Sequence, residues 1–153
     1  MAKLHRVKKA RKDNLAVSAG EPYYWWQHAF QARQYSKRRP KPSQLTLSEF
    51  MSEYLSIGEE LEEAVGGVGG LEDLQQVITD YAERITELRD ETEGKYDNMP
   101  EGPQMSETGE LMLERIQGLE EWAENLEQID TEDEDAELST LAEEATALDP
   151  GLG

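Results

Sequence analysis

Residues 71–91 read LEDLQQVITDYAERITELRDE and carry the most regular helical pattern of the chain. Their large apolar side chains recur at alternating steps of three and four residues, at Leu71, Leu74, Ile78, Tyr81, Ile85 and Leu88. This spacing, kept over nearly three heptads, places the six side chains on one stripe of a helix. The pattern predicts a helix over residues 71–91 with a coiled-coil-like seam.

A second segment with the same kind of stripe follows at residues 108–129. Its apolar side chains are Met112, Ile116, Leu119, Trp122, Leu126 and Ile129. Between the two segments, residues 95–104 contain two prolines and a glycine, which we expect to exclude regular structure and to let the chain reverse. Two helices of similar length joined in this way predict an antiparallel helical hairpin.

A leading helix is predicted upstream of this hairpin. Thr46-Leu47-Ser48-Glu49 matches a capping box, in which the Thr hydroxyl and the Glu carboxylate satisfy amides of the first turn. The apolar stripe that follows consists of Phe50, Met51, Tyr54, Ile57, Leu61 and Val65, and the glycine-rich residues 66–70 should end the helix. Such stripes are more often core than binding groove, although an uncovered apolar edge would favour dimerisation or docking on a partner protein.

Charge divides the chain of 153 residues into two very different parts. Residues 1–43 contain 11 lysines and arginines against 2 acidic residues, a net charge of +9, whereas residues 44–153 contain 4 against 32, a net charge of −28. This asymmetry indicates that the basic part meets a polyanion while the acidic part stays solvated. The alternative is that the two parts attract each other.

The basic part contains the stretch PYYWWQHAF at residues 22–30, with five of the eleven aromatic residues of the chain. Aromatic side chains favour strands, so we expect a strand over residues 23–30 and a return strand over residues 34–38, ended by Pro40 and Pro42. Residues 3–12 fit a short strand or a frayed helix, and periodicity does not decide between them. The fold class is therefore mainly α: an acidic antiparallel helical hairpin with a leading helix, preceded by a small basic β-hairpin module.

Four stretches give the chain a resemblance to known sequences: HRVKKARKD (5–13), YYWW (23–26), RPKPSQLTLSEF (39–50) and DNMPEGPQ (97–104). On these motifs it resembles a group of uncharacterised proteins encoded by tailed bacteriophages, over most of residues 5–129. The resemblance implies a viral origin and a host-cell setting, and it transfers no activity and no functional residue. We expect members of that group to have glycines in the hairpin turn, whereas this chain has Gln31-Ala32. The resemblance therefore does not determine the geometry of this turn.

The candidate functional residues all lie in the basic part and predict a nucleic-acid-binding surface. Cations on the two sides of the hairpin could contact phosphates with a steep dependence on salt. Exposed aromatic rings could stack on unpaired bases. These candidates are Lys8, Lys9, Arg11, Lys12, Trp25, Trp26, Arg33, Lys37, Arg38, Arg39 and Lys41, with Tyr24 and Phe30 as further stacking candidates. The alternative for the aromatic residues is burial, because a sheet this small has few other side chains with which to build a core.

The acidic helices support a second interpretation, in which carboxylates imitate a DNA backbone and occupy a nucleic-acid-binding protein. Eight glutamates could form such rows: Glu59, Glu60, Glu62, Glu63, Glu120, Glu121, Glu124 and Glu127. An acidic solvated face is nevertheless common on helical hairpins, and a basic module is an unexpected companion for a DNA mimic.

Catalytic and metal sites find little support in the sequence. There is no cysteine, and His5 and His28 lack the partners of a transition-metal site. Residues 133–144 have Leu138 where a calcium loop needs glycine, and residues 66–70 lack the ending of a phosphate-binding loop. We therefore expect a protein that is not an enzyme and has no cofactor.

The expected organisation is a basic module (1–43), an acidic helical hairpin (44–129) and an acidic tail (130–153). The tail contains DTEDEDAEL and is expected to be disordered, or at most to lead into a short helix through Leu138, Leu141 and Leu148. No membrane span or secretory signal is visible, so we expect a soluble protein of the host cytoplasm or the virion. The predicted partners are DNA or RNA for the module, and another protein or a second copy for the helices.

Overall fold

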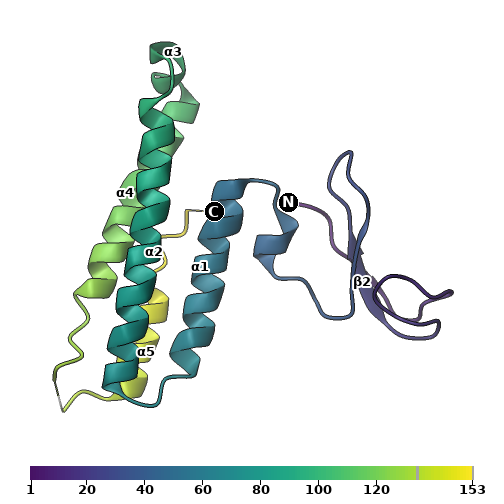
Figure 1. Ribbon diagram of the computed structural model, residues 1–153, viewed down its shortest axis with the longest axis horizontal. Helices are drawn as coiled ribbons and strands as arrows, with labels where there is room; N and C mark the ends of the chain where they lie inside the picture. The colour runs from purple at the N-terminus through teal and green to yellow at the C-terminus, as the bar shows by residue number, and fades with distance from the viewer. Residues whose placement is uncertain (134, 153) are drawn as a thin grey trace. The chain divides into compact units, whose positions relative to one another are not determined.

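The computed structural model describes residues 1–133 and 135–152 and divides into two compact units, Met1–Leu55 and Ser56–Gly153. The first unit holds a three-stranded antiparallel sheet, and the second holds most of the helices (Figure 1). Helix α1 (Glu49–Gly66) contains the division between the units. The boundary between units thus lies within this helix, whereas the change in charge lies at residues 43 and 44.

The predicted helical hairpin is confirmed. Helices α2 (Leu71–Asp97) and α4 (Glu107–Glu127) run side by side in opposite directions, with the single-turn α3 (Glu101–Gln104) where the chain reverses (Figure 1). Leu74, Ile78, Ile85 and Leu88 of the predicted seam are buried, and α2 packs against α4. The mainly helical fold with a small antiparallel sheet is therefore as the sequence predicts.

The core of the helical unit is built from the predicted stripes. Leu119, Trp122 and Leu126 of α4 are almost completely buried, as are Ile57 and Leu61 of α1. Burying an aliphatic or aromatic side chain of this size stabilises a fold by about 1.5–3 kcal/mol. The packing of α1, α2 and α4 is therefore the main source of stability of this unit.

Helix α2 continues past the predicted end of its seam. Thr92 occupies the next seam position and is buried, and its hydroxyl donates a hydrogen bond to the Leu88 carbonyl over 2.7 Å. A polar group satisfied in this way can be buried in a seam at little cost. The helix therefore extends to Asp97, into the segment that the sequence predicted to lack regular structure.

That prediction for residues 95–104 is also wrong at its far end, where α3 forms. Pro100 directly precedes α3 and Pro103 lies within its first turn, where a missing amide hydrogen removes no intrahelical hydrogen bond.

The start predicted for α1 is two residues too early as well. The Ser48 hydroxyl, rather than that of Thr46, accepts the capping hydrogen bond from the Met51 amide at 3.3 Å.

The acidic tail contains a helix in the part for which a disordered segment was the first expectation. Helix α5 (Leu138–Ala147) buries Leu141 and Ala145 and packs against α2. The alternative of a short helix is thus the one observed. Two buried apolar side chains suffice here because α2 already provides a surface on which α5 can pack.

The sheet of the first unit contains β1 (His5–Val7), β2 (Tyr23–Trp26) and β3 (Gln34–Ser36), with β2 in the centre. Register pairs His5 with Trp25, and Trp25 in turn with Tyr35. The sequence did not decide between a strand and a helix for residues 3–12, where β1 forms. It predicted the hairpin of β2 and β3, although both strands are shorter than expected. Near the sheet, the amide of Ala2 donates to the Leu45 carbonyl of the short 3-10 helix η1 (Pro42–Leu45) over 2.6 Å.

Strand β2 ends four residues before the predicted end because the chain turns at residues 28–31. The Gln31 amide donates to the His28 carbonyl over 3.1 Å, and the Gln27 side-chain amide donates to the Gln31 carbonyl over 2.8 Å. Phe30 has a φ of 61°, a left-handed conformation that is rare for an aromatic residue. The turn without glycine is therefore made with Phe30 in the strained position.

Candidate nucleic-acid interface

The two faces of the sheet carry different side chains. Because side chains alternate along a strand, His5, Val7, Tyr23, Trp25 and Tyr35 belong to one face, and Arg6, Tyr24 and Trp26 belong to the other. We call the first set the aromatic face. The alternation thus separates the two neighbouring tryptophans, to which the sequence assigned the same stacking role.

Trp26 is buried, with only 7% of its surface exposed. A base cannot stack on a ring that solvent does not reach, so the burial of Trp26 does not support its predicted stacking role. The alternative of a core position fits this residue. Together with Ala10 and Val17, which are also buried, Trp26 supplies apolar contacts that a three-stranded sheet needs for stability.

Trp25 is half-buried, and its indole ring already has two partners. The His5 ring stacks on it with a centroid distance of 4.0 Å, and the Arg33 guanidinium lies 4.6 Å from the ring centroid. The two groups come from β1 and from the segment preceding β3, so both neighbouring segments contribute a contact to the indole. A nucleic-acid base that stacks on Trp25 would compete with these contacts.

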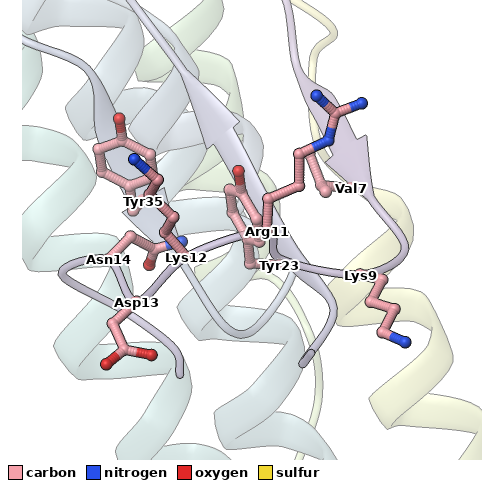
Figure 2. A pocket seen from close by; sticks show the side chains of 8 residues that line it. All are labelled: Val7, Lys9, Arg11, Lys12, Asp13, Asn14, Tyr23 and Tyr35. Carbon is pink, nitrogen blue, oxygen red and sulfur yellow. The ribbon is translucent and has the colours of Figure 1, made fainter. Parts of the chain in front are cut away.

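The aromatic face continues into a pocket of about 560 Å³, which we call the tyrosine pocket (Figure 2). Two tyrosines come from neighbouring strands and the charged side chains come from the segment after β1 (Figure 2). The pocket is lined by Val7, Lys9, Arg11, Lys12, Asp13, Asn14, Tyr23 and Tyr35. Three cations against one carboxylate make its lining positive, and the Tyr23 and Tyr35 rings lie 6.0 Å apart at an angle of 44°.

Short side chains hold the loop that forms this pocket. The Asn14 side-chain oxygen accepts hydrogen bonds from the amides of Ala16 and Val17 at 2.9 and 3.0 Å. The Asp13 carboxylate accepts one from the Ala19 amide at 2.7 Å. Gly20 has a φ of 94° and donates its amide to the Ala10 carbonyl, so the loop returns to β2 through a conformation that glycine allows.

The predicted phosphate-binding cations are all exposed on the first unit. The structure brings three of them, Lys9, Arg11 and Lys12, to one pocket, and it places Arg33 over Trp25. Lys37 pairs with Glu21 at 3.6 Å, which reduces its free charge. The remaining predicted cations, Lys8, Arg38, Arg39 and Lys41, do not line the tyrosine pocket.

Sequence reasoning missed Tyr23 and Tyr35 as candidates. The usable signal was the period of two along the strands, which places Tyr23 beside Trp25 and away from Trp26. Phe30, named as a stacking candidate, is exposed at 107%, and Leu15, which the sequence analysis did not name, is exposed at 92%. Nothing in the composition distinguishes these positions, because exposure depends on loop geometry.

The eight glutamates proposed for DNA mimicry differ in their surroundings. Glu62, Glu63, Glu120, Glu121, Glu124 and Glu127 are exposed, whereas Glu59 and Glu60 are half-buried. Some of them form ion pairs within the unit: Glu60 binds Arg84 at 2.6 Å, and Glu120 lies 3.6 Å from Arg89. These pairs connect α1 and α4 to α2.

In residues 1–133 and 135–152, no group of three or more His, Cys, Asp or Glu side chains is arranged to hold a metal ion. Among the same residues, no helix combines the length and the apolar character that crossing a membrane requires. No protein-family model, curated protein or solved structure matches the chain. The candidate interface therefore stands on its own geometry and charge.

Proposed function

We propose that this chain is a non-enzymatic bacteriophage accessory protein whose sheet unit binds nucleic acid and whose acidic helices make protein contacts. The observation that carries the proposal is the gathering of Lys9, Arg11 and Lys12 around an aromatic-walled pocket, in a segment of net charge +9. Cations supply phosphate contacts, and aromatic rings supply contacts to bases. The carboxylates of the helical unit repel nucleic acid, so they leave binding to the sheet unit.

The test is a titration of the full-length protein with labelled DNA and RNA at two salt concentrations. Replacing one phosphate-binding cation, with Lys12→Gln, should weaken binding and lower the slope of log affinity against log salt by about 0.7–0.9. Lys95→Gln is the matched control, because Lys95 is exposed in the helical unit and its replacement changes the net charge equally. Equal effects of the two variants, or no binding by the wild-type protein, would contradict the proposal.

A second candidate is an interaction protein, either an acidic inhibitor of a host nucleic-acid-binding enzyme or a virion component. It is favoured by exposed apolar side chains in and just before the first turns of α4, namely Met105, Leu111 and Leu113. Such side chains in an acidic surface suit a partner with apolar and basic groups. Pull-down from host lysate should recover a specific basic protein, and L111S/L113S should abolish its recovery.

A further inference from the structure

The tyrosine pocket is larger than a phosphate group requires. Its volume of about 560 Å³ lies within the range of about 300–1,000 Å³ that is usual for sites of small organic ligands. Its walls combine the rings of Tyr23 and Tyr35 with the cations of Lys9, Arg11 and Lys12. We propose that this pocket takes one unpaired nucleotide, so that the protein prefers single-stranded nucleic acid to duplex. This inference rests on the proposed nucleic-acid-binding function and specifies its ligand.

The pocket is lined by two kinds of side chain, aromatic rings and cations, which suit the base and the phosphate of a nucleotide. The tyrosine rings are half-buried in the sheet and offer π-faces and hydroxyl groups to a base. The three cations are exposed on the segment after β1, where they can contact the phosphate of the same nucleotide and that of its neighbour. A simple anion would use the cations and leave the aromatic wall without a function.

Stacking on the tyrosine rings selects an unpaired base. In a duplex both faces of a base are covered by stacking, so a protein ring can stack on it only after the base leaves the helix. Tyr23 and Tyr35 lie in strands β2 and β3, and Arg11 and Lys12 line the same pocket from the segment after β1. A base that projects from a single strand can enter such a pocket, whereas the surface of a duplex contacts only the exposed cations.

The other aromatic side chains of the sheet are less suited to this role. Trp26 is buried, and the Trp25 ring is already in contact with His5 and Arg33. The tyrosine pocket, in contrast, is preformed: Asp13 and Asn14 both accept backbone hydrogen bonds that fix the loop. A preformed site binds more tightly because less conformational freedom is lost on binding.

The experiment compares a fluorescein-labelled single-stranded 12-mer with its duplex, titrated with full-length protein at the same low salt concentration. We expect the single strand to bind at least tenfold more tightly. Y23L/Y35L removes both rings but keeps apolar volume, and it should weaken single-strand binding roughly tenfold or more, within the range for loss of one stacked base. Duplex binding should change less than twofold.

Tyr96→Leu is the matched control, because Tyr96 is half-buried like Tyr23 and Tyr35 but lies in α2 of the helical unit. It should leave both affinities within twofold of the wild type. Binding of the duplex as tight as that of the single strand, or an equal loss of both in Y23L/Y35L, would overturn this inference alone. Absence of binding to either nucleic acid would overturn the proposed function as well.

A measurement on the wild-type protein tests the inference even where the double variant does not fold. An iodouracil-containing single strand is photocrosslinked to the full-length protein, and the linked peptide is identified by mass spectrometry. Crosslinks at Tyr23 or Tyr35 are expected. Crosslinks confined to Trp25 or Phe30 would place the base outside the tyrosine pocket and overturn the proposal.

Discussion

The helical unit and the sheet unit differ in how far they bury their large apolar side chains. In the helical unit, most of the large side chains of α2 and α4 that form the seam are buried, and charged residues cover the outside. In the sheet unit, Trp26 is buried but Tyr23, Tyr24, Trp25 and Tyr35 remain half-exposed, and Phe30 is fully exposed. Aromatic surface left open in a small, strongly basic unit is available for a ligand, whereas a closed seam serves stability.

The largest expected effect tests how tightly the helical unit is closed. Gly109 at the start of α4 is buried, and a methyl group there would overlap the backbone carbonyl of Gln104. Because backbone cannot rotate away as a side chain can, Gly109→Ala should lower the free energy of unfolding by about 3 kcal/mol, the upper end of the usual range for overpacking. Chemical denaturation followed by circular dichroism at 222 nm measures this loss.

Gly102→Ala in α3 is the control, since no atom lies within 4 Å of the position of the added methyl group. It should leave the unfolding midpoint nearly unchanged. Equal midpoints for the two alanine variants would show that the turn between α3 and α4 is not closely packed.

The second prediction asks whether the two units are separable in stability. Trp26→Leu removes much of the largest buried side chain of the sheet and should destabilise the sheet unit by about 2 kcal/mol. Hydrogen exchange should then accelerate in β1, β2 and β3, while the amides of α2 and α4 keep their protection. Equal loss of protection in both units would show that they unfold as one.

A smaller effect of opposite sign is expected at Gly94, within α2. No atom lies within 4 Å of a methyl group added there, and the backbone is already helical. Alanine loses less conformational entropy on folding than glycine, so Gly94→Ala should raise the free energy of unfolding by about 0.5–1 kcal/mol. A lower thermal midpoint in this variant would contradict the helical continuation of α2 to Asp97.

The smallest effect concerns Tyr81 in the seam between α2 and its neighbours. Burial, followed by the charge of Glu60, raises the pKa of Tyr81 above its ordinary value of 10.0. The unfolded chain therefore ionises first, so the stabilising contribution is complete below pH 10 and is lost as the pH rises through the folded pKa. The free energy of unfolding should thus fall less steeply above pH 10 in Tyr81→Phe than in the wild type.

Much of the helical unit could be predicted because its information is local and periodic. The steps of three and four in residues 71–91 and 108–129 identify the two stripes, and a stripe has to be covered by another one. The predictions failed at the ends of helices. Helix α2 continues past Thr92 because the Thr92 hydroxyl hydrogen-bonds to the backbone of its own helix, and α3 accommodates Pro103 because this residue lies in a first helical turn.

The sequence alone determined the division of charge at residues 43 and 44, the seam of the hairpin and the basic, aromatic character of the sheet unit. Only the tertiary structure decided that Trp26 is buried, that Trp25 is in contact with His5 and Arg33, and that Tyr23 and Tyr35 form a pocket with cations from the loop after β1. The physical reason is the separation along the sequence of the residues that each property involves. Charge and periodicity are sums over neighbours in sequence, whereas a pocket depends on strand register and loop closure, which bring together residues separated along the chain.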